Sequence, residues 1–217
     1  GGGSMERMMS SQPEPIVGSA TEADPVQIPK ASRDIVVDGD ISDWADVAPM
    51  PMPFMDMKLS TVHFCWSPAG LYCAVVATDE RIDTDPFAPW TGDGLEIWVQ
   101  KDGARVDDRN EHSAQYTFAP DPESEQGECF VVIPYGGMMD MEEDVQCAWK
   151  KTDIGWNMEV LIPADMLKPA EMKPGTKIGL NFAVEDDGVP TQQFVSDKDV
   201  DEGYRTPSSW GVAVLAE

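Results

Sequence analysis

A series of short strand-like segments separated by turn residues constrains the fold of this chain more than any other feature. The segments are rich in Val, Ile, Phe, Tyr and Trp and are bounded by Gly, Pro, Asp and Asn. They are residues 60–66, 71–78, 94–100, 114–119, 128–134, 145–150, 156–162, 177–185 and 210–215. Only Pro163 to Leu167 suggests a helical turn. This spacing is typical of antiparallel sheets and not of βαβ units. We therefore predict an all-β fold, a two-sheet antiparallel β-sandwich of the jelly-roll or immunoglobulin-like kind.

The length of 217 residues fits one large β domain preceded by a tail. Gly1-Gly2-Gly3-Ser4 before Met5 resembles a remnant of an expression vector. The rest of residues 1–32 is proline-rich with no hydrophobic period, which predicts a disordered tail or linker. We expect the folded domain to span 33–217, with a short strand at Ile35-Val36-Val37 and an edge segment from Met50 to Met57.

The charge of the chain excludes some partners. Lys and Arg number 15 against 40 Asp and Glu, a formal net charge of -25. Nucleic acid and an anionic membrane surface would be repelled. No apolar run is long enough to span a membrane, and no signal-peptide core is visible near the N-terminus. The acidity could suit Ca²⁺, although a solvated acidic surface is the simpler explanation.

The four cysteines form no CxxC pair, so a structural zinc site is not expected. In a hairpin of residues 62–76, Cys65 and Cys73 would face opposite sides of the sheet, which argues against a disulfide between them. Cys129 and Cys147 could meet across a second hairpin. Buried free thiols are the simpler prediction for all four.

The stretch from Pro89 to Trp98 carries the strongest functional signal. Trp90 lies in a turn of Pro, Gly and Asp, where a large aromatic ring has little core to pack into. Glu96 alternates with Leu95 and Ile97 in the strand that follows, so its carboxylate points to one sheet face. An exposed ring beside a fixed acceptor is suited to a sugar, although Glu96 could simply be the solvent-facing residue of an alternating strand.

Several motifs, read in order, resemble the successive signatures of family 9 carbohydrate-binding modules. They cover residues 35–216, nearly the whole predicted domain. The motifs are Ile35-Val36-Val37-Asp38-Gly39-Asp40-Ile41-Ser42-Asp43-Trp44, the Trp66/Leu71-Tyr72 hairpin ending in Thr78-Asp79, Pro89-Trp90-x-x-Asp93-x-Leu95-Glu96-Ile97, Gly155-Trp156-x-x-Glu159-Val160-x-Ile162-Pro163, Gly175-x-x-Ile178-Gly179-x-Asn181, and Pro207-x-x-Trp210-Gly211.

The resemblance implies a sandwich that grips a sugar ring between two aromatic side chains and binds the end of a polysaccharide, an oligosaccharide or a monosaccharide. Trp90 matches one aromatic plate and Glu96 a ligand-contacting carboxylate. The second plate falls on Tyr204, where members carry Trp. An Arg that contacts the sugar in members would fall near Thr117, so this chain lacks it there, and the Asn-rich loop before the second plate is replaced by 200–203.

Other polar groups could join this site. Arg205 could supply the missing guanidinium or form a surface ion pair with Asp201 or Glu202. Asp93 belongs to the Trp90 signature and is a further candidate for ligand binding. The remaining tryptophans, in strand or hairpin positions, are expected to form the scaffold: Trp44, Trp66, Trp98, Trp149, Trp156 and Trp210.

Carboxylates in two places are candidates for Ca²⁺, one group in the loop ahead of Trp90 and the other after the strand expected at 177–185. They are Asp79, Asp83, Asp85 and Asp186. Their spacing does not match an EF-hand loop, and a solvated acidic loop is the alternative.

We expect no enzymatic activity. Glu96 and Glu159 could be imagined as a glycosidase pair, but nothing in the sequence sets their separation. His63 and His112 are the only histidines, and neither lies near a nucleophile motif. The prediction is thus a non-catalytic sugar-binding module, extracellular or periplasmic and attached to other domains of a larger protein.

Two alternatives remain. Related sandwiches hold haem, for which His63 and Met57 would be candidate ligands. The domain could also be a structural or interaction module that has lost sugar affinity.

Overall fold

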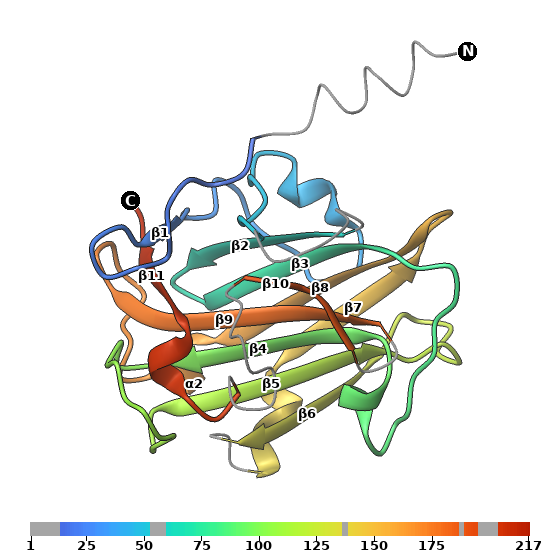
Figure 1. The fold of residues 1–217 in the computed structure, drawn as a ribbon. Helices are drawn as coiled ribbons and strands as arrows, with labels where there is room; N and C mark the ends of the chain where they lie inside the picture. The colour runs from blue at the N-terminus through green and yellow to red at the C-terminus, as the bar shows by residue number, and fades with distance from the viewer. Residues whose placement is uncertain (1–13, 53–59, 136–138, 187–188, 195–203) are drawn as a thin grey trace.

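Two β-sheets packed face to face make up the described part of the chain (Figure 1). A computed structural model describes residues 14–52, 60–135, 139–186, 189–194 and 204–217. Besides the strands, the described residues include one short α-helix, α2 (Ala164–Leu167), and several 3-10 turns. The predicted two-sheet β-sandwich is confirmed.

In the described part of the chain, the larger sheet has seven strands. Its strands follow the order β1-β11-β9-β4-β5-β6, and β10 pairs with the far end of β9. Their bounds are β1 (Val26–Ile28), β4 (Gly94–Gln100), β5 (Ser113–Pro120), β6 (Cys129–Tyr135), β9 (Lys177–Asp186), β10 (Val189–Gln193) and β11 (Gly211–Leu215).

The smaller sheet has four strands in the order β2-β3-β8-β7. Their bounds are β2 (Thr61–Ser67), β3 (Gly70–Thr78), β7 (Gln146–Lys151) and β8 (Gly155–Pro163). Every strand expected from alternation and turn residues between 60 and 215 is present, and its ends lie within one residue of the expected ones. The helical turn at 163–167 is present as α2.

The folded domain begins earlier than the predicted residue 33, because the first strand, β1, lies before that residue. Val26 and Ile28 are completely buried, and β1 pairs in parallel with β11, Val26 lying opposite Ala213. A strand this short, bounded by Pro25 and Pro29, has too few residues to show a period, so its sequence resembled a linker. Residues 1–13 lie outside the described residues.

The strand expected at Ile35-Val36-Val37 does not form. Instead, this segment runs over the outer face of the smaller sheet, where Ile35 and Val37 pack against a buried cluster that includes Trp44 and Tyr72. The amide of Val36 donates to the Asp43 carboxylate at 3.0 Å, so it is bonded to a side chain and not to a neighbouring strand. The expected edge segment at 50–57 lies mostly outside the described residues; Met50 donates its amide to the Val62 carbonyl.

A buried carboxylate anchors the N-terminal turn to the smaller sheet. Glu159 of β8 is fully buried and accepts hydrogen bonds from the amides of Asp38 (3.2 Å) and Gly39 (2.8 Å) and from the indole of Trp44 (2.9 Å). Burial raises the pKa of Glu159 to about 7, although the Trp44 and backbone hydrogen bonds oppose this rise. The Asp-Gly turn and its tryptophan therefore have a structural role.

The cysteines are free thiols, as predicted, but only Cys65 and Cys73 are buried, whereas Cys129 and Cys147 are half-buried. Cys65 belongs to the cluster on the outer face of the smaller sheet, whereas Cys73 lies in the main core, so the two do face opposite sides. Cys129 and Cys147 approach each other within hydrogen-bonding distance from β6 and β7. Burial raises the pKa of Cys147 well above the usual 9.0, which keeps this thiol protonated.

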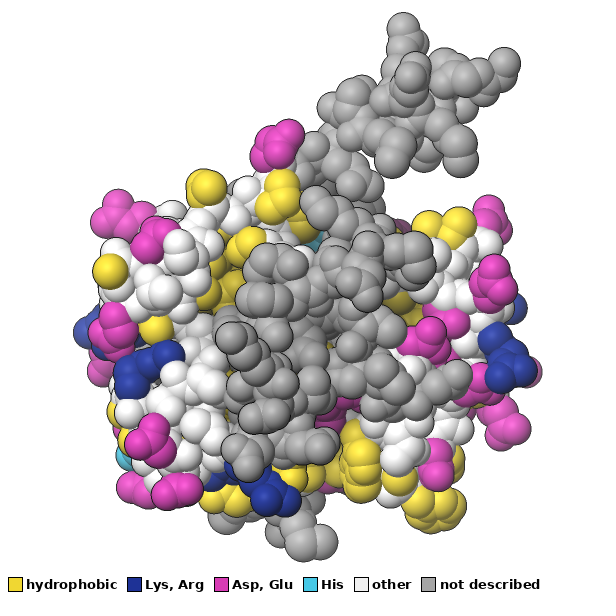
Figure 2. All heavy atoms as spheres, viewed as in Figure 1, with side chains coloured by type: hydrophobic (Ala, Val, Ile, Leu, Met, Phe, Trp, Pro, Cys, Tyr) yellow, Lys and Arg dark blue, Asp and Glu magenta, His cyan; other side chains and the backbone are white. Residues whose placement is uncertain are grey.

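Acidic side chains are spread over the surface seen in Figure 2, and basic ones are fewer. Among the described helices, none is both long and apolar enough to cross a membrane.

Replacing Trp44 with Phe should test the role of the buried carboxylate. The variant removes one donor to Glu159, and we expect the free energy of unfolding to fall by about 1.5–3 kcal/mol, as for a hydrogen bond to a charged group. Trp156→Phe is the matched control, because Trp156 is equally buried and its indole N–H has no partner among the described residues. Urea unfolding measures both, and equal losses would contradict the role assigned to Trp44.

Candidate functional site

The centre of the larger sheet is buried on both faces. Along β4, Leu95, Ile97 and Val99 face the core between the sheets, whereas Glu96 and Trp98 face outward. All seven residues of β4 are nevertheless buried, and only 7% of Glu96 is exposed. The alternative of Glu96 as an ordinary solvent-facing residue is therefore wrong, because this outer face is covered.

Glu96 is the acceptor at the centre of a polar strip. Its Oε1 accepts from Gln115 Nε2 and from Thr117 Oγ1, each at 3.2 Å. Thr117 lies directly opposite Glu96 in the β4–β5 register. Thr117, near which the resemblance would place a sugar-contacting Arg, thus offers a hydroxyl that donates to Glu96.

Glu185 of β9 completes the strip as a neutral donor. Its carboxyl group hydrogen-bonds to that of Glu96, and two carboxyl groups can do so only if one keeps its proton. Burial, this hydrogen bond and the charge of Glu96 raise the pKa of Glu185 to about 11. At neutral pH Glu185 therefore keeps its proton and shares it with Glu96 in this hydrogen bond.

Arg109 occupies the other end of the strip and was not identified from the sequence. Its Nη2 donates to Gln115 Oε1 at 2.9 Å, and its Nε donates to the carbonyl of Tyr204 at 2.6 Å. The guanidinium carbon lies 4.5 Å from the ring centre of Tyr135 and 5.2 Å from that of Tyr204. The loop that carries it, between β4 and β5, is charged and has no period, so no local signal singled out this arginine.

Tyr204, the expected second plate, lies on this face. It is half-buried and packs against Trp98 and Trp210. Arg205 donates from Nε to the Tyr204 hydroxyl at 2.6 Å, and its guanidinium lies 5.0 Å from the ring centre. Arg205 is therefore a neighbour of the expected plate. Asp201 and Glu202, its other expected partners, lie outside the described residues.

Trp90, the expected first plate, is exposed over 43% of its surface, whereas the other six tryptophans are at most 7% exposed and form the scaffold as predicted. It lies in the 3-10 turn η2 (Pro89–Thr91), which contacts β4, β5 and β6. Buried Pro89 and a backbone hydrogen bond from Thr91 to Ala88 hold this turn. No ring contact joins Trp90 to Tyr204 in the described part of the chain.

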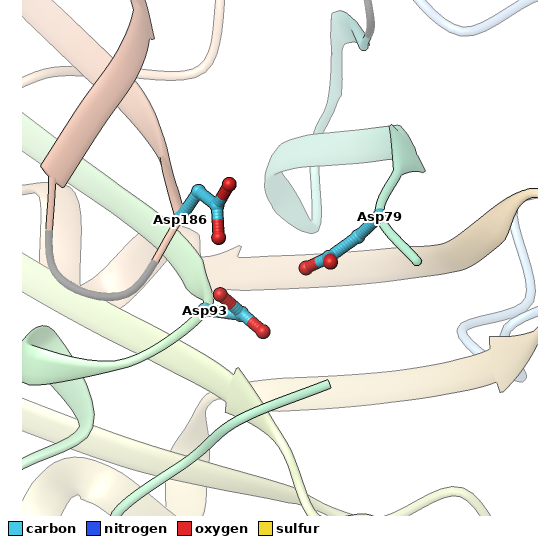
Figure 3. A group of neighbouring side chains, drawn as sticks. All are labelled: Asp79, Asp93 and Asp186. Atoms are coloured by element: carbon cyan, nitrogen blue, oxygen red, sulfur yellow. The ribbon is translucent and has the colours of Figure 1, made fainter. Parts of the chain in front are cut away.

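Three carboxylates converge beside this turn (Figure 3). Asp79, Asp93 and Asp186 each place an oxygen within 4.8 Å of the others, which is a grouping that could hold a metal ion. Asp93 is completely buried, and its Oδ2 accepts the amide of Asp83 at 2.7 Å. The sequence had assigned Asp93 to the sugar site and had not placed it with Asp79 and Asp186.

The other two expected metal ligands do not join this group. Asp83 uses its carboxylate to bind Arg81 Nε at 2.8 Å, and Asp85 accepts the amide of Phe87 at 2.9 Å. Asp93 comes from a third segment of the chain, and no local spacing reveals that it lies beside Asp79 and Asp186.

Two alternatives lose support from the geometry. Glu96 and Glu159 lie on the outward faces of different sheets, so the core separates them and they cannot flank one glycosidic bond. Both ring nitrogens of His63 are engaged, one with the Val47 carbonyl and the other with the Thr61 hydroxyl, which leaves no nitrogen for a haem iron. Met57 lies outside the described residues.

Comparisons with known proteins agree with this fold. A family model for the "Carbohydrate family 9 binding domain-like" family matches residues 52–217. The chain belongs to this family. Its members are carbohydrate-binding modules, which are typically non-catalytic.

Two solved structures of a family 9 carbohydrate-binding module from Caldicellulosiruptor kristjanssonii share this fold. The complex with cellotriose is 17% identical, with a TM-score of 0.67, over 88% of this chain and 93% of that one. The complex with glucose is 19% identical, with a TM-score of 0.68, over 87% and 95%. No curated protein matches the sequence.

Replacing Glu185 with Gln should stabilise this family 9 domain. The folded-state pKa is raised above the ordinary 4.5, so at neutral pH folding must take up a proton, and stability falls as pH rises above about 4.5. Gln is neutral in both states and keeps a donor toward Glu96. We expect E185Q to exceed the wild type in unfolding free energy by about 1–3 kcal/mol at pH 8 and by less at pH 5. A pH-independent difference in urea unfolding would contradict the shared proton.

Proposed function

We propose that this chain binds a carbohydrate at the outer face of the larger sheet, with one sugar ring held between Trp90 and Tyr204 and hydrogen-bonded by Glu96. The observation that carries the proposal is the exposed indole of Trp90 in a turn that contacts β4 and β5, the strands bearing Glu96 and Thr117. Sugar C–H faces stack on aromatic rings, and each hydroxyl needs a partner once water is displaced. The site offers both kinds of contact.

The ligand we propose is glucose or a short glucose oligosaccharide. The two similar structures were solved with glucose and with cellotriose. Glu96 would accept hydrogen bonds from sugar hydroxyls, and Arg109 and the protonated Glu185 would donate them. Neutral sugars carry both donors and acceptors and suit such a mixed set.

Truncating Trp90 tests the site. We expect Trp90→Ala to weaken cellotriose binding at least about 10-fold, since a stacked aromatic contributes on the order of 1–2 kcal/mol. Phe87→Ala is the matched control, because Phe87 lies in the same loop and is 91% exposed. Isothermal titration compares both with the wild type.

Equal affinity of wild type and Trp90→Ala would refute the site assignment. Absence of glucose and cellotriose binding by the folded wild type would favour a structural or interaction domain that has lost sugar affinity.

We also propose that Asp79, Asp93 and Asp186 bind Ca²⁺. This ion takes carboxylate and carbonyl oxygens in flexible geometries, and three carboxylates this close repel one another unless protons or a cation neutralise them. The triad lies where the turn leading into β4 meets the ends of β3 and β9, so a bound ion would fix the loop that carries Trp90.

Calcium should therefore raise the melting temperature of the protein. At a free concentration about 100 times the dissociation constant, the stabilisation is about 2.7 kcal/mol. Asp93→Asn should remove most of this gain, whereas Asp83→Asn, in the same loop but outside the triad, should keep it. Thermal unfolding with Ca²⁺ and with a chelator measures the difference. A calcium response that survives in Asp93→Asn would place the ion elsewhere.

A further inference from the structure

Among the described residues, Arg109 is the one cation that contacts both Gln115 of the polar strip and the ring of Tyr204. From Arg109 the hydrogen bonds run through Gln115 to Glu96 and on to Glu185. These residues come from the β4–β5 loop, β5, β4 and β9, so the strip crosses three neighbouring strands. Its members are therefore fixed relative to one another by the sheet.

The Arg109 guanidinium is held by hydrogen bonds from two of its three nitrogens. Two of its nitrogens, Nε and Nη2, donate to Tyr204 and Gln115, and its plane lies near the rings of Tyr135 and Tyr204. The Nη1 group has no hydrogen-bond partner among the described residues. A guanidinium carries five N–H donors, so one edge remains available to a ligand.

Arg109 also fixes the backbone of Tyr204. The hydrogen bond to the Tyr204 carbonyl and the cation–π contact with its ring come from a side chain more than 90 residues earlier in the sequence. This contact helps to set where the aromatic ring stands relative to Glu96. Arg109 thus links the aromatic ring of Tyr204 to Glu96, the proposed hydrogen-bond acceptor.

Arg105 of the same loop provides a comparison. It donates to the carbonyls of Trp210 and Ser208, so it too fastens the loop to the C-terminal segment. It has no contact with the Glu96 strip or with the ring of Tyr204 among its described interactions. The two arginines share a fastening role, and only Arg109 borders the site.

We propose that Arg109 is a specificity-determining residue of the sugar site, whose free guanidinium edge donates a hydrogen bond to one sugar hydroxyl while its other edge positions Tyr204. This inference rests on the proposed sugar binding. It assigns the donor function to a residue of the β4–β5 loop, since Thr117 and its bond to Glu96 leave no guanidinium at that position of β5.

Titration of glucose and of the set of monodeoxy glucoses into wild type and Arg109→Ala tests the proposal. We expect Arg109→Ala to bind glucose about 10- to 100-fold more weakly, as for loss of a charged hydrogen bond. One monodeoxy sugar should bind the wild type more weakly than glucose does and should lose nothing further in the variant. Arg109→Lys should also bind glucose more weakly than the wild type, because a lysine cannot bond to Gln115, Tyr204 and the sugar together.

The controls separate this donor role from loop fastening. Arg105→Ala should bind glucose within about 3-fold of the wild type and should show the same pattern with deoxy sugars. Thermal unfolding checks that each variant is folded, and Arg109→Gln replaces Arg109→Ala if the latter is not.

Two results would overturn the inference while leaving sugar binding intact. One is wild-type affinity for glucose in Arg109→Ala. The other is that, for every deoxy sugar, the loss caused by Arg109→Ala adds fully to the loss caused by the missing hydroxyl. An equal loss in Arg105→Ala would also overturn it. Absence of glucose and cellotriose binding by the wild type would overturn the proposed function, and this inference with it.

Discussion

Burial of the centre of the larger sheet on both faces is the constraint from which the rest of the candidate site follows. The inward face packs in the sandwich core, and the outward face of β4 is covered as well. A polar group there loses contact with water and must find a partner in the protein. Glu96 meets this demand through Thr117, Gln115 and Glu185. These hydrogen bonds hold the polar strip in place. Glu185 retains its proton because a second buried charge beside Glu96 would be too costly.

The fold was largely predictable from the sequence because its strands are regular. Alternating apolar residues and Gly, Pro and Asp at the turns define both the period and the ends of each strand from β2 to β9. The failures have physical causes. β1 is too short to show a period, and Ile35–Val37 is extended and apolar without a strand partner, because it packs on a sheet face and does not join an edge. The local sequence pattern therefore predicts which residues are buried better than it predicts their hydrogen-bond partners.

The site was predictable only where a single residue contradicts its surroundings. Trp90 stood out because a large ring in a polar turn has little to pack against, and it is indeed exposed. Arg109 did not stand out, since an arginine in a charged loop is ordinary until the fold brings Tyr135 and Tyr204 to it. The acidic triad has the same origin: Asp79, Asp93 and Asp186 meet only after β3, β4 and β9 have taken their places.

The parallel pairing of β1 with β11 also determines how the domain responds to force. The chain enters the larger sheet at Val26 and leaves it at Leu215, at neighbouring positions on one edge (Figure 1). Tension applied at these two points pulls parallel neighbours in opposite directions along their length. The bonds between them, together with that from Ala216 to Ile28, are then loaded at the same time and do not open one after another. This shearing arrangement resists the separation of β1 from β11.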